Sequence, residues 1–232
     1  MSDRYSRQTM LPEIGPEGQR RFAEASVLIV GVGGLGSVVA TYLTGAGVGR
    51  IGLADPDVVS VSNLQRQVLY TEAEVGLRKV EMAQRRLSAQ SAATQFDLWT
   101  LGLTEENAEE IIGQYDLVVD CTDNFPVRFL IDDVTARLGK PWVHGSIGEF
   151  AGQVAVFNHL SGLRYADLYD QREQLCAQPR TVSGVVGAVP GVIGAIQASE
   201  ALKLIAGYGE SLDGKLFIID LKTLHTNLIQ LT

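Results

Sequence analysis

Short apolar runs alternate with longer segments of helical periodicity over the first 146 residues of the chain. The runs that predict buried strands cover residues 27–30, 51–54, 94–101, 117–120 and 141–144. Segments with apolar residues at helical spacing lie between them, at residues 38–46, 77–90, 105–112 and 127–138. Strands that alternate with helices are typical of a parallel sheet with helices on both faces. The pattern therefore predicts an α/β fold with a doubly wound, Rossmann-like sheet.

The pattern changes after residue 146, where helices no longer follow every strand. Residues 152–157 predict one more strand, residues 187–205 a long helix, and residues 215–220 and 226–231 an antiparallel pair of strands. We therefore expect the mostly parallel sheet to end in antiparallel strands towards the C-terminus.

One long stretch, residues 158–184, shows little periodicity of either kind. A connection of this length in a compact domain is usually functional or mobile. We interpret it as a long crossover loop within a single domain that covers residues 1–232, and residues 1–25 as an N-terminal arm.

Composition and charge narrow the class of protein. The chain has 27 acidic residues against 19 Lys and Arg, a net charge of −8, whereas nucleic-acid binding needs a basic face. The N-terminus lacks the apolar core of a signal peptide, and no apolar run reaches the ~18 residues of a membrane span. We expect a cytoplasmic protein with neither a nucleic acid nor a membrane as its partner.

A glycine-rich turn separates the first predicted strand from the first predicted helix. Gly31, Gly33 and Gly36 fit the pattern G-x-G-x-x-G, and Gly34 lies within it. Such a turn lets phosphate oxygens reach backbone N–H groups at the N-terminus of a helix. Asp55 follows the second strand, where a carboxylate accepts hydrogen bonds from ribose hydroxyls. The alternatives are an empty structural turn and, for Asp55, a helix cap or a solvated turn.

Two cations then shift the interpretation from nicotinamide chemistry to phosphate chemistry. Arg66 offers a planar fork for phosphate oxygens, and Lys79 a point charge. Asn63 and Gln67 add polar groups close to Arg66. The alternative for Arg66 and Lys79 is that each is a solvated surface cation.

A second acidic motif ends the strand at residues 117–120. Open α/β sheets bind ligands at the carboxyl ends of their strands. Asp120 and Asp123 could hold Mg²⁺ against a polyphosphate, because Mg²⁺ takes one or two carboxylates together with phosphate oxygens. The alternative is that these aspartates cap the helix that begins near Phe125.

Seven motifs together carry a resemblance to a known family. They lie at residues 4–8, 31–36, 55–57, 62–67, 76–79, 120–124 and 184–187. Over nearly its whole length the chain resembles the ThiF/MoeB/HesA adenylyltransferases, relatives of the adenylation domains of ubiquitin-activating enzymes. The resemblance implies an enzyme that uses Mg-ATP to adenylate the C-terminal glycine of a small ubiquitin-fold sulfur carrier of the ThiS/MoaD type, with release of pyrophosphate.

The resemblance also implies roles for individual residues. Asp55 would hold the ribose of ATP, Arg66 and Lys79 would contact its phosphates, and Asp123 would bind Mg²⁺ or orient the α-phosphate. Arg7 would reach into the active site of the second subunit of a homodimer. The full set expected to bind the nucleotide is Gly31, Gly33, Gly34, Gly36, Asp55, Asp57, Asn63, Arg66, Gln67, Lys79, Asp123 and Asn124.

The chain departs from the family at the zinc site that many members hold with two C-x-x-C pairs. Arg164 and Asp167 stand at the cysteine positions of the first pair, and no second pair follows the last predicted strand. We therefore expect no structural zinc. An Arg164–Asp167 ion pair is one replacement, and two exposed loop charges are the alternative.

Two cysteines and one histidine need separate interpretation. Cys176 lies in the crossover loop, where some relatives carry a cysteine that links to the activated carrier; the alternative is an unused thiol. Cys121 ends an apolar strand, so we expect it to be buried and inert. His144, close to Trp142 on a strand, is expected to be a packed core histidine.

Other functions stay open at this point. An NAD-dependent oxidoreductase would use the same glycine turn, but no residues for proton relay accompany it. A non-catalytic partner of an active homologue would have no need of every nucleotide-contacting position. A relative that activates a tRNA base carboxylate is disfavoured by the acidic composition. The sequence does not choose among carriers of the thiamine, molybdopterin, cysteine and siderophore pathways, and a sulfurtransferase or cysteine desulfurase is a candidate further partner.

Overall fold

A single mixed sheet forms the centre of the computed structural model, which describes residues 3–178 and 184–231. Among these residues the sheet has eight strands in the order β3-β2-β1-β4-β5-β6-β7-β8. The strands from β3 to β5 in this order are parallel, and β6, β7 and β8 are added antiparallel. The bounds are β1 (Ser26–Val30), β2 (Arg50–Ala54), β3 (Gln95–Trp99), β4 (Leu117–Asp120), β5 (Trp142–Gly148), β6 (Ala151–Phe157), β7 (Lys215–Asp220) and β8 (His225–Gln230).

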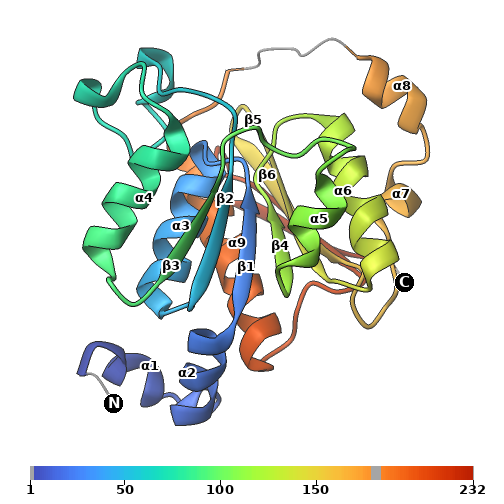
Figure 1. Ribbon diagram of the computed structural model, residues 1–232. Helices are drawn as coiled ribbons and strands as arrows, with labels where there is room; N and C mark the ends of the chain where they lie inside the picture. The colour runs from blue at the N-terminus through green and yellow to red at the C-terminus, as the bar shows by residue number, and fades with distance from the viewer. Residues whose placement is uncertain (1–2, 179–183, 232) are drawn as a thin grey trace.

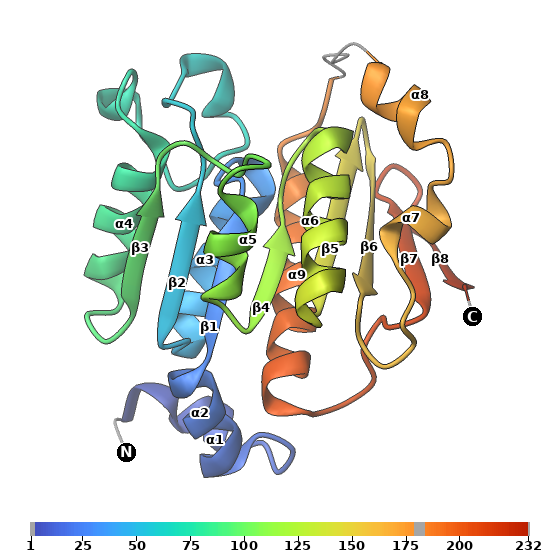
Figure 2. The same ribbon diagram turned by 45° about the vertical axis from the view of Figure 1, so that its right-hand side comes forward.

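Helices cover both faces of the parallel half of the sheet (Figures 1 and 2). One face carries α3 (Gly34–Ala46), α4 (Lys79–Gln90) and α9 (Ala188–Ala206), and the other carries α5 (Ala108–Gly113) and α6 (Phe125–Leu138). Alternate residues of β1 enter two separate cores: Val27 and Ile29 pack on the first face, Leu28 and Val30 on the second. The predicted doubly wound fold with antiparallel C-terminal strands is confirmed.

The predicted bounds of helices and strands agree best with the observed bounds where an apolar run is short and lies between polar residues. The strands predicted at residues 117–120 and 215–220 have these same bounds in β4 and β7. The first core helix begins at Gly34, before the predicted start at residue 38, because the last glycines of the turn already belong to α3. The chain between β2 and α4 contains two short 3-10 helices, η2 (Val61–Asn63) and η3 (Glu72–Glu74).

The N-terminal arm is helical, which the sequence pattern did not indicate. It comprises η1 (Asp3–Tyr5), α1 (Ser6–Thr9) and α2 (Gly15–Glu24), which lie beyond the amino ends of the parallel strands (Figure 1). Gln8 and Gln19 both donate to the carbonyl oxygen of Ala46 at the end of α3, over 3.1 and 2.9 Å. Phe22 is the one large apolar side chain that α2 buries, so its periodic signal is weak.

The described part of the crossover segment, residues 158–178 and 184, contains α7 (Tyr165–Leu168) and α8 (Arg172–Ala177); residues 179–183 lie outside the described residues. Asp132 of α6 fixes this segment, because its buried carboxylate accepts the backbone N–H of Tyr165 and bonds to the guanidinium of Arg164. That guanidinium also pairs with Asp133. The expected Arg164–Asp167 ion pair is therefore wrong: Asp132 and Asp133 take the guanidinium, and Asp167 accepts the backbone N–H of Arg164.

α9 is the long core helix that packs on α3, β5 and β6. It is the one helix among the described residues that is long and apolar enough to cross a membrane by length and composition alone, with a mean hydropathy of 1.3. Two glycines on the sheet make room for it, because a Cβ on Gly145 would lie 2.3 Å from Gln197 and one on Gly152 would lie 2.4 Å from Ile193. These contacts with α3 and the sheet make it a core helix of this domain.

Candidate functional site

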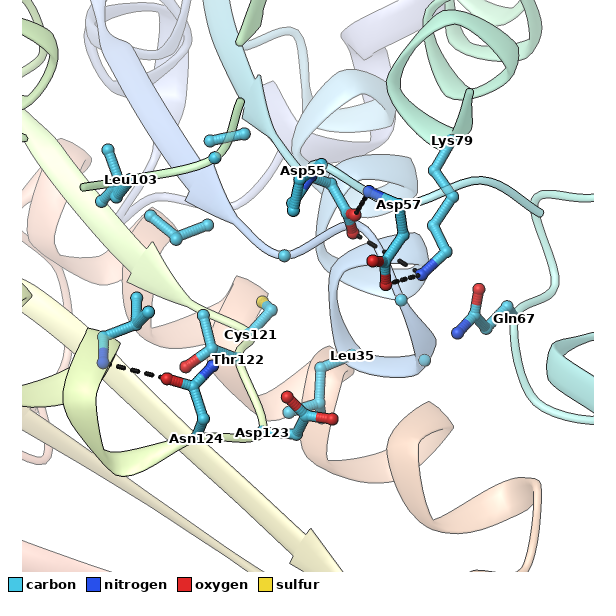
Figure 3. A pocket seen from close by; sticks show the side chains of 18 of the residues that line it. Leu35, Asp55, Asp57, Gln67, Lys79, Leu103, Cys121, Thr122, Asp123 and Asn124 are labelled. Carbon is cyan, nitrogen blue, oxygen red and sulfur yellow. Dashed lines mark hydrogen bonds and ion pairs between the residues drawn. The ribbon is translucent and has the colours of Figure 1, made fainter. Parts of the chain in front are cut away.

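A cavity of about 290 Å³ opens at the carboxyl ends of β1, β2 and β4. It lies where the strand order reverses, since β1 runs between β2 and β4. This is the position at which open α/β sheets bind ligands. Figure 3 shows two groups of side chains facing each other across it, with Asp55, Asp57 and Lys79 on one side and Asp123 and Asn124 on the other.

The glycine-rich turn forms the floor between these groups. Gly31 has a φ of +87°, and a Cβ on Gly36 would lie 2.0 Å from the carbonyl oxygen of Gly31, so both positions require glycine. Gly31, Gly33 and Gly34 line the cavity, whereas Gly36 does not. α3 begins at Gly34 without a side-chain cap, so its first N–H groups are available to an anion.

Asp55 connects this turn to the end of β2. Its side chain is 5% exposed and accepts the backbone N–H of Val32 over 2.7 Å and that of Asp57 over 2.9 Å. Both alternatives for Asp55, a helix cap and a solvated turn, are therefore wrong. Two carboxylate oxygens offer about four acceptor positions, so capacity is left for a hydroxyl donor in the cavity.

Lys79 is the first residue of α4 and is 4% exposed. Its ammonium group lies 2.9 Å from the Asp57 carboxylate and 3.9 Å from that of Asp55. The interpretation of Lys79 as a solvated surface cation is wrong. Because the Asp57 carboxylate is 67% exposed, solvent weakens its hold on Lys79, and a polyanion in the cavity can compete for the ammonium group.

Arg66 and Gln67 complete this side of the cavity. The guanidinium of Arg66 donates to the carbonyl oxygen of Ser62 over 3.0 Å, and its side chain runs past Gly34. Gln67 is buried beside Gly33, and its Oε1 has no hydrogen-bond partner among the described residues. The side-chain amide nitrogen is the atom that faces the glycine-rich turn, because a Cβ on Gly33 would lie 3.3 Å from Gln67 Nε2.

Asn63 and Asn124 were both expected to bind the nucleotide, and only Asn124 lines the cavity. Asn63 does not line the cavity; its carbonyl oxygen accepts the backbone N–H groups of Arg66 and Gln67 and so shapes their turn. Asn124 lines the cavity and is also the N-cap of α6, since its Oδ1 accepts the N–H of Val127 over 3.0 Å. The cap of this helix is thus Asn124 and neither of the two aspartates before it.

The acidic pair at residues 120 and 123 is divided between the cavity and the core. Asp123 lines the cavity, whereas Asp120 is fully buried and does not. Asp120 therefore cannot share a metal ion with Asp123 at the cavity. No cluster of three or more His, Cys, Asp and Glu side chains suited to a metal ion occurs in the described part of the chain.

Asp120 forms a buried pair with His144, its register partner on β5, with Oδ2 and Nδ1 2.9 Å apart. Burial opposes ionisation of Asp120, but the hydrogen bond from His144 and the charge of Arg128 hold its pKa below the usual value. Burial also lowers the pKa of His144, against the hydrogen bond to Asp120. Neutral His144 therefore donates its Nδ1 proton to the Asp120 carboxylate. The prediction of a packed core histidine is confirmed.

The structure places two candidate residues, Cys176 and Arg7, away from this cavity. Cys121 lines the cavity and is buried as expected, and burial raises the pKa of its thiol. Cys176 on α8 is half-buried and packs on the apolar core that lies between the sheet and helices α5 and α6. It does not line the cavity. Arg7 is exposed on α1, which lies beyond the opposite end of the strands (Figure 1).

Several residues at the site were not predicted. Leu101 and Leu103, after β3, and Val127, on α6, supply an apolar wall to the cavity. Arg128 and Gln197 hold the segment after β4 from behind, through the carbonyl oxygens of Thr122 and Asp120. Apolar residues after a strand form no motif, and the partners on α6 and α9 become visible only when the chain is folded.

Sequence comparison places the chain among well-defined relatives. A sequence profile of the ThiF family matches residues 5–232. A sulfur carrier protein adenylyltransferase of Thermus thermophilus is 48% identical over 224 residues, which cover 94% of this chain and 83% of that protein. The adenylyltransferase and sulfurtransferase MOCS3 of Culex quinquefasciatus is 46% identical over 222 residues, which cover 94% of this chain and 50% of that protein. The chain thus spans about half the length of this second relative.

Solved structures agree on the fold. A crystal structure of E. coli MccB with selenomethionine MccA superposes with a TM-score of 0.86 at 22% identity, covering 100% of this chain and 72% of that one. Selenomethionine PaaA superposes with a TM-score of 0.83 at 21% identity, covering 98% of this chain and 72% of that one. The structural likeness shows the fold, and the profile match with relatives above 40% identity shows the family. The chain belongs to the ThiF family.

Proposed function

We propose that this protein is an adenylyltransferase that transfers AMP from ATP to the C-terminal glycine carboxylate of a small ubiquitin-fold sulfur carrier. The products are an acyl-adenylate and pyrophosphate. The observation that carries the proposal is the buried Lys79 ammonium group beside the uncapped N-terminus of α3, in one cavity with Arg66 and Asp123. The names of the relatives, which include a sulfur carrier protein adenylyltransferase, support it.

The residues present fit ATP. Gly33 and Gly34 leave the floor of the cavity open to phosphate oxygens, and the side-chain amide nitrogen of Gln67, beside Gly33, is a donor to them. Lys79 and Arg66 are cations that a triphosphate can engage bidentately or as point charges. Asp55, on the same side of the cavity as Lys79, keeps acceptor capacity for a ribose hydroxyl.

The chemistry required is mainly charge neutralisation. A carboxylate is ionised at neutral pH, so the attack of the carrier's terminal oxygen on the α-phosphorus needs no general base. Both reactants are anions, and the departing pyrophosphate gains charge, so fixed cations and N–H groups stabilise the transition state more than the ground state. Mg²⁺, when bound with ATP, neutralises phosphate charge, and Asp123 is the residue that would hold it.

Further parts of the proposal concern assembly and surroundings. We propose a homodimer in which Arg7 of one chain serves the cavity of the partner, because α1 is tied by Gln8 to the far end of its own sheet.

Cys176 is a candidate acceptor for the activated carrier, with a sulfurtransferase or cysteine desulfurase as sulfur source. No zinc is needed where Asp132 and Arg164 tie the crossover segment. The proposed location is the cytoplasm.

The experiment is exchange of labelled pyrophosphate into ATP, run with a panel of ubiquitin-fold proteins that end in Gly-Gly. Exchange that depends on one carrier and on its terminal glycine would establish the reaction and the carrier. Arg66→Ala and Asp123→Ala should abolish it, while Lys215→Met, at a residue that does not line the cavity, should not. Full exchange in both site variants would rule out the proposed site, and tight binding of NAD in place of ATP would favour an oxidoreductase.

A further inference from the structure

A buried polar cluster lies directly behind the acidic side of the cavity. It contains Asp120 of β4, His144 of β5 and Arg128 of α6, none of which lines the cavity. Asp120 and His144 are fully buried, and Arg128 is 7% exposed. Arg128 Nε lies 3.5 Å from Asp120 Oδ2, the same oxygen that faces His144 Nδ1. His144 and Arg128 thus meet at the Asp120 carboxylate, behind the lining of the cavity.

Two members of this cluster, Asp120 and Arg128, hold Thr122. Asp120 Oδ1 accepts both the N–H of Thr122, over 2.9 Å, and its hydroxyl, over 2.7 Å. Arg128 donates to the carbonyl oxygen of Thr122 over 2.7 Å. Each hydrogen-bonding group of Thr122 is therefore held by Asp120 or Arg128. Thr122 lines the cavity and is covalently joined to Asp123, so its backbone sets where Asp123 stands.

The same segment is also pressed against the glycine-rich turn. A Cβ on Gly31 would lie 2.8 Å from the carbonyl oxygen of Cys121, and the N–H of Cys121 donates to the carbonyl oxygen of Val30 over 2.8 Å. On the other side, Gln197 of α9 donates to the carbonyl oxygen of Asp120 over 2.6 Å. A shift of Asp120 would therefore move the Asp123 side of the cavity relative to its phosphate-binding floor.

We infer that Asp120, held by His144 and Arg128, is a positioning residue that fixes Thr122 and thereby sets the place of Asp123 in the reaction. This inference rests on the adenylyl transfer proposed above. Asp120 acts through another residue and does not contact the reactants. The reason for a fully buried charge cluster at this point is geometric: a carboxylate that accepts two bonds from one residue restricts that residue more than a neutral side chain would.

The network makes Asp120→Asn an informative change. The amide oxygen of the substituted side chain can still accept from Thr122, but its amide donor then faces the Nδ1 proton of His144. His144 must then change tautomer, which turns its Nε2 proton towards the Gln153 amide nitrogen, 3.4 Å away. Arg128 loses its counter-charge at the same time. One isosteric substitution therefore disturbs the positioning of Thr122 without removing volume.

The test compares Asp120→Asn with Glu200→Gln, a matched control. Glu200 is a carboxylate that is 2% exposed, accepts the backbone N–H of Leu212 and pairs with Lys203, but it does not line the cavity. The rate is expressed as kcat per mole of ATP-binding sites. We expect Asp120→Asn to lower this kcat of pyrophosphate exchange ~10- to 100-fold, as misplacement of a catalytic group by about 1 Å does. The KM for ATP should change less than kcat. Glu200→Gln should keep kcat per binding site.

A conservative pair at His144 separates positioning from packing. His144→Asn keeps a donor close to the Nδ1 position, whereas His144→Leu removes it; both lose the ring that packs on Trp142 and Tyr165. Positioning predicts that kcat of the Asn variant lies closer to wild type than that of the Leu variant. Equal losses in both, or kcat of Asp120→Asn no lower than that of Glu200→Gln, would overturn the inference.

A second readout does not depend on the reaction. Amide hydrogen exchange in ligand-free protein should become faster in residues 118–126 of Asp120→Asn, with residues 27–30 unchanged. If no carrier supports pyrophosphate exchange in the wild-type protein, the proposed function fails, and this measurement still decides whether Asp120 holds the segment. Unchanged exchange in residues 118–126 would overturn the inference in that case too.

Discussion

Two aspartates at the ends of β2 and β4, the strands on either side of β1, have the same local geometry and different surroundings. Asp55 follows β2 and Asp120 ends β4, and both are almost fully buried. Each accepts the backbone N–H of the residue two positions later over 2.9 Å, Asp57 in one case and Thr122 in the other. Judged by these local turns alone, the two residues are equivalent.

Their second oxygens go to different places. Asp55 Oδ2 accepts the N–H of Val32 in the glycine-rich turn and lies 3.9 Å from Lys79, so this carboxylate belongs to the cavity wall. Asp120 Oδ2 faces His144 and Arg128 in the core. The difference teaches that one kind of turn can present a carboxylate to a ligand or hold a neighbouring residue in place. The adjacent strand decides which.

The largest expected effect is a difference in unfolding free energy between alanine variants of the two aspartates. Asp120→Ala leaves Arg128 without its counter-charge and His144 and Thr122 without their acceptor, which should cost about 3–5 kcal/mol of unfolding free energy. Asp55→Ala leaves two backbone N–H groups unsatisfied beside a cavity that admits water, and should cost about 1–3 kcal/mol. Denaturant titration of both variants measures this, and a larger loss for Asp55→Ala would contradict the comparison.

The next effect concerns activity on the Asp55 side. Lys79→Met removes the cation between Asp55 and Asp57, so two carboxylates face the incoming phosphates. We expect kcat/KM of pyrophosphate exchange to fall by ~100-fold or more, as for loss of one transition-state donor. ATP binding followed by calorimetry should weaken as well. Lys215→Met, which breaks an ion pair with the exposed Glu210, is the control and should match wild type.

A smaller effect, on the Asp120 side of the comparison, is the pH dependence of the unfolding free energy. Burial puts the pKa of His144 below its usual value of 6.5, so the unfolded chain takes up a proton near pH 6.5 that the native protein refuses. Stability should therefore fall as pH falls from 6.5 towards 5, with a slope of up to about 1.4 kcal/mol per pH unit. The groups that face His144 are Asp120, Arg128, Tyr165 and Gln153. His144→Asn should flatten the curve of unfolding free energy against pH, and parallel curves would contradict this assignment.

The smallest effect lies at the outer end of the Asp120 network. The hydroxyl of Tyr169 accepts a hydrogen bond from Gln153 over 2.6 Å, and Gln153 in turn lies beside His144. Tyr169→Phe removes that acceptor and keeps the ring stacked on Tyr165. We expect a loss of about 1 kcal/mol in unfolding free energy, with kcat of pyrophosphate exchange almost unchanged. A large loss of kcat would mean that the segment after α7 takes part in positioning Asp123.

Much of the fold and part of the site could be predicted from local patterns. The strands at residues 117–120 and 215–220 were predicted with their observed bounds, because apolar runs between polar residues depend only on the period of the strand. The glycine-rich turn was predicted because backbone sterics at Gly31 and Gly36 are local. Helix α2 was missed because one buried aromatic, Phe22, is too little for a periodic signal.

The sequence by itself determined that this is an α/β protein with a glycine-rich turn, and that Asp55, Arg66 and Lys79 are close to it. The fold class and the turn follow from side-chain periodicity and backbone conformation, which act over a few residues, whereas the placement of Arg66 and Lys79 is what the family resemblance implied. Only the tertiary structure decided that Asp123 lines the cavity while Asp120 pairs with His144, 24 positions away. That division depends on the order and register of β1, β4 and β5, because hydrogen bonds between strands join residues that no local pattern relates.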